Sequence, residues 1–185
     1  IGRWKAQRIP IWSLAYFRFW LVKQLTVLSP LSLFQGYPLY NVYLRMLGAK
    51  IGRNVVLDCL HLPVCTDLLT VGDHTILRAH SNLSSYTARA NYIVVGSITL
   101  GSHVVVGEGS SIDINTVMED QAQLGHASAL YEGQVVPAGV SYHGCPAQET
   151  TTDFRFNGKH AVGWVRQFAY SFIQLFLLLG VPAPL

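Results

Sequence analysis

The most regular feature of the chain is a six-residue repeat of aliphatic residues between positions 94 and 136. Every sixth residue in this stretch is aliphatic, and the residue four places further on is mostly small or β-branched. A helix repeats its apolar face about every 3.6 residues and a single strand about every two, so a sustained period of six fits neither. It indicates short units that bury their apolar faces against one another, as in a β-solenoid. The aliphatic positions are Val94, Leu100, Val106, Ile112, Met118, Leu124, Leu130 and Val136.

The repeat extends towards the N-terminus with two interruptions. It begins at Ile51, shifts by two residues between positions 63 and 69, and resumes at Val71. Residues 89–93 break the phase again, and we expect a small protruding loop there. We therefore predict a mainly β solenoid over residues 48–152.

If each coil has three six-residue faces, residue n lies beside residue n plus about 18 in the next coil, because neighbouring parallel strands stack directly. This offset predicts which aliphatic side chains stack inside the solenoid. The three predicted stacks are Val94 with Ile112 and Leu130, Leu100 with Met118 and Val136, and Val106 with Leu124.

The same offset places two polar side chains, Glu108 and His126, one above the other outside the core. A carboxylate against an imidazole would fix the tautomer of the ring and raise its basicity, as a general base requires. His143 lies next to the residue that the following coil brings to this edge, so the two histidines could flank one cleft. His103 would stack on Gln121 at a different turn. The alternative is that all of these are ordinary exposed turn residues.

Composition narrows the classes of function. Half of the residues are hydrophobic and 12% are charged, a low share of charge for a soluble domain. The net charge of +3 includes no dense basic run, so we expect no nucleic-acid partner. Cys59, Cys65 and Cys145 form neither an even framework nor a CxxC pair, which argues against a disulfide scaffold or a zinc knuckle. The histidines lack ligand spacing on any one element, so no metal site is predicted.

Both ends of the chain suggest contact with a membrane. Residues 1–47 contain six Lys or Arg residues, no acidic residue and several aromatic residues, which is typical of a helix at a membrane interface. Residues 168–181 carry no charge and follow Trp164 and Arg166, as a short transmembrane segment would. At each end the alternative is a helix that covers an open end of the solenoid.

These patterns divide the chain into three parts. They are an N-terminal membrane-associated helical segment (1–47), a β-helix (48–152), and a C-terminal linker with a partial transmembrane helix (153–185). The sequence shows neither an initiator Met nor a signal-peptide pattern, and we expect it to be a piece of a longer protein. We expect a membrane-associated protein with the β-helix on the cytoplasmic side.

Several stretches carry a family resemblance: "VVVGEGSSIDINTVM", "QLGHASALYEGQVVPAG" and "YHGCPAQET". They resemble the C-terminal region of poly-lysine-synthetase-type (Pls-type) non-ribosomal peptide synthetases, and the resemblance covers roughly residues 12–152. In that family an adenylation domain and a carrier domain precede a membrane-embedded region with tandem β-helical domains related to hexapeptide-repeat acyltransferases. The resemblance implies a left-handed parallel β-helix flanked by membrane-associated helices.

The resemblance also implies an activity, acyl or aminoacyl transfer, in which an amine attacks a carrier-bound thioester to form a peptide or isopeptide bond. His126 falls on the family's LGH motif, Glu108 on its VGE motif and His143 on its HG-x-PA motif, and these three are the catalytic candidates. Asp113 and Asp67 also fall on motif positions and are the candidates for substrate binding.

The resemblance implies no directly bound cofactor but the phosphopantetheine of a partner carrier domain, with acyl-CoA as the alternative. The expected partners are the carrier domain, neighbouring β-helix domains or subunits in a pseudo-trimer or homo-oligomer, and membrane lipid. Two other functions stay open. One is a non-catalytic β-helix scaffold in a tandem array, and the other is an acyl-CoA-dependent hexapeptide acetyltransferase.

Overall fold

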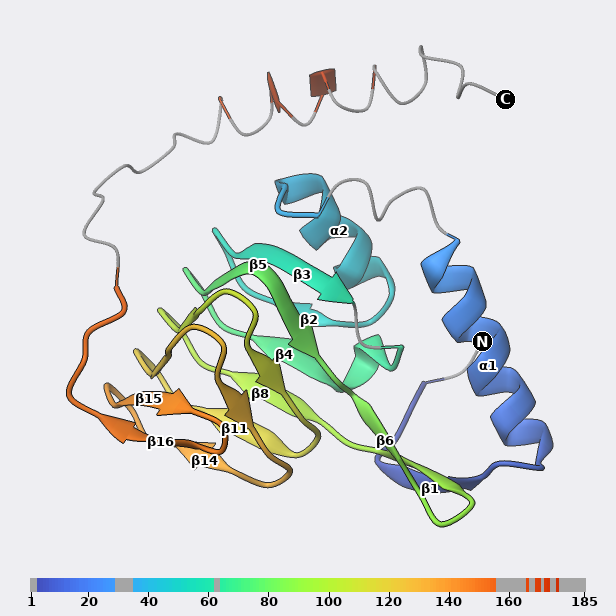
Figure 1. The fold of residues 1–185 in the computed structure, drawn as a ribbon. Helices are drawn as coiled ribbons and strands as arrows, with labels where there is room; N and C mark the ends of the chain where they lie inside the picture. Colours follow the sequence, from blue (N-terminus) through green and yellow to red (C-terminus); the bar gives the residue numbers. More distant parts are fainter. Residues whose placement is uncertain are drawn as a thin grey trace.

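The computed structural model describes residues 3–28, 35–61 and 64–155, together with positions 166, 169, 170, 172, 173 and 176. These residues form a solenoid of short parallel strands (Figure 1). Helix α2 (Pro38–Met46) lies over the first coil, and helix α1 (Leu14–Val27) lies beside the solenoid. The mainly β architecture predicted from the hexad repeat is confirmed.

The strands of the solenoid stack into three faces. One face is built from β2 (Lys50–Ile51), β4 (Leu69–Val71), β8 (Ile98–Leu100), β11 (Thr116–Met118) and β14 (Val135–Val136). A second contains β3 (Val56–His61), β5 (Ile76–Leu83), β9 (Val105–Val106), β12 (Gln123–Leu124) and β15 (Ser141–Gly144). The long strand β5 turns a corner, so its end begins the third face, which continues with β10 (Ser111–Ile112) and β13 (Ala129–Leu130).

The register of these strands confirms the offset of eighteen residues. Val105 pairs with Gln123, and Gln123 pairs with Ser141 in the next coil. The predicted stack of Leu100, Met118 and Val136 is present, and all three side chains are buried in one core. In the first coils the offset is twenty, since Lys50 pairs with Thr70, which agrees with the two-residue shift expected between 63 and 69.

The predicted stack of Val94, Ile112 and Leu130 is correct for Ile112 and Leu130, which pair in neighbouring coils, but wrong for Val94. Val94 lies in an antiparallel hairpin formed by β6 (Tyr86–Arg89) and β7 (Tyr92–Val95), and Leu83 takes the expected place beside Ile112. Three consecutive aliphatic residues, 93–95, satisfy a six-residue phase by coincidence. The expected small loop is therefore a hairpin, and strand β1 (Gln7–Pro10) pairs with β7 to extend it to three strands.

The small-residue place of the repeat has a hydrogen-bonding role. Thr75, Ser110 and Ser128 are buried there, and each hydroxyl donates to a backbone carbonyl oxygen, at 2.7 to 3.0 Å. Each also accepts from a backbone N–H: that of Val104 for Thr75, of Ser128 for Ser110, and of Gly144 for Ser128. These buried hydroxyls satisfy polar groups that the turns between strands would otherwise leave unpaired.

Both ends of the solenoid are covered. On the first coil, Tyr40 and Leu44 of α2 are buried in the main core, and the Asn41 side chain donates to the Val55 carbonyl at 2.6 Å. On the last coil, β15 turns back into β16 (Ala147–Thr150), whose Ala147 belongs to the same core. Part of the N-terminal segment therefore packs on the solenoid. This agrees with the alternative stated for this region, a helix that covers an open end of the solenoid.

Helix α1 packs against the hairpin sheet. The Ser13 hydroxyl caps it by accepting from the Tyr16 N–H at 3.2 Å. Phe19 is buried, and its ring meets that of Tyr86 edge-on with centroids 5.0 Å apart. The opposite side of the helix leaves large apolar side chains such as Phe17 and Leu25 in solvent, and Trp12 in the turn before the helix is also exposed.

Membrane crossing receives no support from this part of the chain. In the described ranges, no helix combines the length and the apolar character that a bilayer span requires. Nine of the fourteen positions of the predicted C-terminal membrane segment (168–181) fall outside the described residues, as do positions 29–34 of the N-terminal apolar stretch.

Candidate functional site

Glu108 and His126 occupy the same corner of successive coils, as the repeat predicted. The Ala127 N–H donates to the Glu108 carbonyl at 2.8 Å, which joins the two turns. Both side chains are exposed. The contact between them is made by the backbone, because the Glu108 N–H donates to Nδ1 of His126 at 3.1 Å.

This contact corrects the expected arrangement of a carboxylate orienting an imidazole. Among the described hydrogen bonds none involves the Glu108 carboxylate, so the backbone amide fixes the ring instead. A neutral imidazole that accepts at Nδ1 carries its proton on Nε2. Nη1 of Arg78, a group that only donates, lies 3.4 Å from that Nε2 and would favour the other tautomer, but the Nδ1 contact is shorter, at 3.1 Å, and assigns the proton to Nε2. This edge of His126 is therefore electropositive and suited to a developing negative charge.

His143 has the opposite tautomer, set by Ser128. Its Nδ1 lies 3.1 Å from Oγ of Ser128. The same hydroxyl donates to the His126 carbonyl at 3.0 Å and accepts from the Gly144 N–H at 3.1 Å. Because the single hydroxyl proton is used on the carbonyl, Nδ1 of His143 must be the donor to Oγ. Nε2 of His143 then keeps its lone pair, the form that a general base needs.

The segment after β16 passes over both histidines. The Phe154 ring lies 5.6 Å from the His143 ring and 6.3 Å from the His126 ring, between centroids. Its backbone N–H donates to Oε1 of the buried Gln123 at 2.7 Å, which anchors the segment to β12. Sequence reasoning missed Phe154 and Ser128, since Phe154 follows the last hexad and Ser128 read only as a small core residue.

The two aspartates proposed for substrate binding serve local structure. Oδ1 of Asp113 accepts from the Ile114 N–H at 2.8 Å within its own turn. Oδ2 of Asp67 accepts from the Trp4 N–H at 3.1 Å, which ties the N-terminal segment to the solenoid. Within the described ranges, neither carboxylate forms a hydrogen bond or ion pair with His126 or His143.

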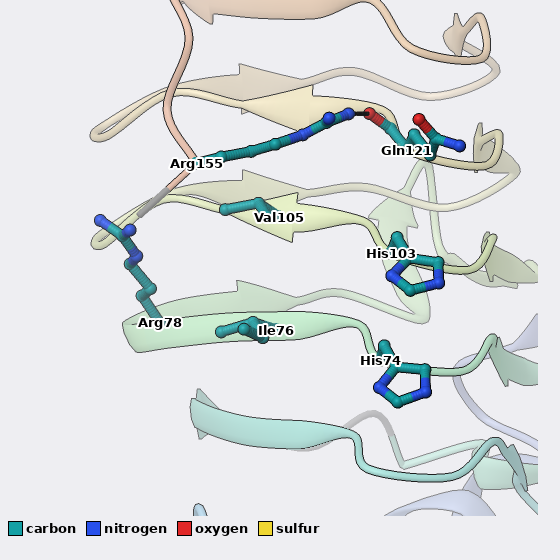
Figure 2. Close-up of a pocket in the computed structure, with 7 residues that line it drawn as sticks. All are labelled: His74, Ile76, Arg78, His103, Val105, Gln121 and Arg155. Carbon is teal, nitrogen blue, oxygen red and sulfur yellow. Dashed lines mark hydrogen bonds between the residues drawn. The ribbon is translucent and has the colours of Figure 1, made fainter. Parts of the chain in front are cut away.

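A pocket of about 380 Å³ lies on the outer surface of β5 and β9, close to this corner (Figure 2). Ile76 and Val105 form its apolar floor, and His74 and His103 stand at one edge with parallel rings 5.0 Å apart. Sequence reasoning missed the pair. The sequence contained a signal for it. Each histidine lies three positions after the aliphatic residue of its hexad, in Val71-Gly72-Asp73-His74 and Leu100-Gly101-Ser102-His103.

Neither cysteine chemistry nor a metal site emerges from the described residues. Burial raises the pKa of the Cys59 and Cys65 thiols to about 12, which keeps them protonated. Cys145 is exposed, and its sulfur lies 3.4 Å from the Tyr131 hydroxyl, a contact that raises the pKa of Tyr131. No cluster of three or more potential ligands occurs in the described ranges.

The class of fold is shown by solved structures. The chain resembles a maltose O-acetyltransferase from Clostridium difficile 630, with a TM-score of 0.58 and 16% identity over 78% of this chain and 91% of that one. It also resembles a hexapeptide-repeat acetyltransferase from Vibrio cholerae (TM-score 0.51, 12% identity, 73% and 92% covered). A galactoside acetyltransferase in complex with coenzyme A is similar as well (TM-score 0.51, 11% identity, 85% and 95% covered). The fold is that of the hexapeptide-repeat acetyltransferases.

A more specific likeness comes from sequence. The chain is 37% identical over 144 residues to the delta-poly-L-ornithine synthetase of Acinetobacter baumannii strain AB307-0294. The match covers 78% of this chain but 11% of that protein, so the chain corresponds to a small part of its relative. No protein-family model matches. The resemblance to poly-amino-acid synthetases and hexapeptide-repeat acyltransferases drawn from the motifs is confirmed.

Proposed function

We propose that the chain is an acyltransferase domain that forms an amide bond between an acyl or aminoacyl thioester and an amine. The observation that carries this proposal is the Ser128–His143 pair, which leaves Nε2 of His143 unprotonated on the corner that also holds His126, with the Phe154 ring close to both imidazoles. The acetyltransferase fold and the likeness to a polyornithine synthetase support the same reaction class.

In the proposed step, Nε2 of His143 takes a proton from the attacking amine as its nitrogen bonds to the thioester carbonyl carbon. The oxyanion that forms accepts a hydrogen bond from the Nε2–H of His126. When this intermediate collapses, the carbon–sulfur bond breaks, and the departing thiolate takes the proton held by His143. An amide and a free thiol result. The thioester would be carried on the phosphopantetheine arm of a carrier domain, or on coenzyme A.

The exposure of the site bears on its partners. Both histidines lie on an outer corner of the solenoid, and Phe154 covers one side of them. Acyl transfer to an amine must exclude water, which would otherwise hydrolyse the thioester. A neighbouring β-helix domain or subunit that packs against this corner would provide the missing wall. The same exposed corner would also suit a non-catalytic scaffold, the competing function.

The test uses the full-length parent protein, an acyl-pantetheine thioester and an amine acceptor, with the amide product measured by mass spectrometry. We expect the wild type to form amide faster than the uncatalysed reaction. We expect His126→Ala to slow it about 10²-fold or more, because an oxyanion donor is lost. Unchanged turnover in His126→Ala would instead assign this domain a scaffold role.

We also propose that the outer side of α1 lies at a membrane surface. Trp12, two residues before α1, is 96% exposed, and Leu14 and Phe17 of the helix are 89% and 58% exposed, which is a large apolar exposure for one short segment. Arg8 and Arg18 lie close by in sequence, as expected of a helix that meets anionic headgroups.

Vesicle co-sedimentation tests this placement. The wild-type chain should sediment with vesicles that contain anionic lipid, and the double variant Trp12→Ser with Phe17→Ser should lose most of that binding because the apolar contact is removed. Val135→Ser, an exposed apolar residue on β14, is the matched control and should bind as the wild type does. Equal binding by all three proteins would exclude α1 as the contact.

A further inference from the structure

The pocket on β5 and β9 is lined by two guanidinium groups and two imidazoles. Two arginines, Arg78 and Arg155, border it, and the two stacked imidazoles of His74 and His103 form the opposite edge (Figure 2). Among the described residues, no carboxylate lines it. Three carboxylates lie near lining residues in sequence, and each accepts from a backbone N–H: Asp73 from that of Arg53 at 2.6 Å, Asp120 from that of Ser102 at 2.7 Å, and Asp153 from that of Arg155 at 3.0 Å.

Within the part of the chain that the structure describes, neither arginine forms an ion pair, although Arg155 lowers the pKa of Asp153 through the hydrogen bond from its backbone N–H and, to a smaller extent, through its charge. In the described ranges the only salt bridge joins Arg89 and Glu132 at another part of the solenoid. Arg155 crosses the top of the pocket and donates to the Gln121 carbonyl at 2.7 Å, and Arg78 donates to the Phe154 carbonyl at 3.4 Å. Each guanidinium carries five N–H donors, so most donors on each side chain remain available for a ligand.

We propose that this pocket binds the phosphate group of a phosphate ester whose aliphatic part lies on Ile76 and Val105. Two planar guanidinium groups match the several acceptor oxygens of a phosphate, and such charge-assisted bonds are stronger than neutral ones. The apolar floor would contact methylene groups rather than a second charge. A cationic acceptor amine would be repelled here, so the pocket serves the donor and not the acceptor.

The position of Arg78 connects the pocket with the catalytic corner. The same guanidinium reaches 3.4 Å from Nε2 of His126, while β12 and Gln123 lie between the pocket and His143. A ligand anchored by its phosphate could therefore extend along the sheet surface towards the histidines. The assignment of this ligand as the acyl donor rests on the proposed function, whereas phosphate binding itself does not.

Binding measured without turnover tests the proposal. Isothermal titration would compare 4′-phosphopantetheine with pantetheine, which lacks the phosphate, on the 185-residue chain in low salt. We expect pantetheine to bind at least about tenfold more weakly, and Arg155→Gln to weaken 4′-phosphopantetheine by at least about tenfold without changing pantetheine. Arg78→Gln should have the same effect. Arg89→Gln, which removes an equal charge elsewhere, should bind as the wild type does.

Equal affinity for the two probes would overturn the proposal. Equal weakening of 4′-phosphopantetheine binding by Arg89→Gln and Arg155→Gln would also overturn it, because the effect would then come from the net charge of the protein and not from the pocket. Coenzyme A is the third probe. Affinity equal to that of 4′-phosphopantetheine indicates a carrier-borne arm as the source of the phosphate, and tenfold tighter binding indicates a free nucleotide donor. If amide formation occurs in the parent protein but Arg155→Gln leaves its KM for the thioester unchanged, the pocket assignment fails and the proposed reaction stands.

Discussion

Replacing His143 by Ala is expected to slow amide formation in the parent protein by about 10²- to 10⁴-fold, the usual contribution of a positioned general base. The ring is exposed and contributes little to the core, so the variant should fold normally. Its loss should appear in kcat with little change in KM, because proton removal matters in the transition state more than in binding. Initial rates over a range of amine concentrations measure both constants.

Ser128→Ala tests whether the hydroxyl sets the tautomer of His143. Without Oγ, Nδ1 loses its acceptor, and the rate and its pH profile should both change. Ser110→Ala is the matched control, because that hydroxyl is equally buried one coil away and donates to the Gly125 carbonyl without touching a histidine. Equal rate losses in both serine variants would mean a structural effect only.

Glu108→Gln tests the carboxylate–histidine pair predicted from the sequence. A rate loss as large as that in His143→Ala would support a catalytic role for the Glu108 carboxylate.

The regular part of the fold was predictable because one periodicity governs it. From Leu100 to Val136 every aliphatic residue of the repeat is buried, and a constant offset of eighteen aligns the coils. The hairpin at residues 86–95 was not predictable in the same way. Its two strands pair antiparallel with each other, and β7 also pairs with β1, a contact between segments more than eighty residues apart that no local period encodes.

The repeat predicted which site residues lie on neighbouring coils, but not which of their atoms form hydrogen bonds. The repeat placed Glu108 beside His126, yet the donor turned out to be a backbone N–H, since the direction of a turn amide depends on its dihedral angles. The pocket was not predicted, because His74 and His103 are 29 residues apart in sequence and not eighteen. The inserted hairpin lengthens the offset between these two coils. Phe154 and Arg155 lie beyond the repeat and reach the site only through tertiary packing.

Gly107→Ala is expected to produce the largest loss of stability among single substitutions at the catalytic corner. A Cβ at this position would lie 2.5 Å from the carbonyl carbon of Gly125 and 2.5 Å from the backbone nitrogen of His126. Both contacts are with backbone, so no side chain can rotate to relieve them. The neighbouring coils would have to separate, at the expense of the hydrogen bond from the Gly107 N–H to the Leu124 carbonyl at 2.8 Å.

Overpacking of this kind costs about 1–3 kcal/mol when side chains can adjust, and a backbone clash should reach at least the upper value. For a chain of this size that corresponds to a fall in Tm of roughly 6–12 °C, measurable by circular dichroism. Gly109→Asn is the control two residues away. Its Cβ would meet nothing within 4 Å, and asparagine tolerates the φ of +66°, as Asn54 and Asn115 do at equivalent turns. A Tm shift of equal size in both variants would show that the coils do not approach as closely as the eighteen-residue stacking requires.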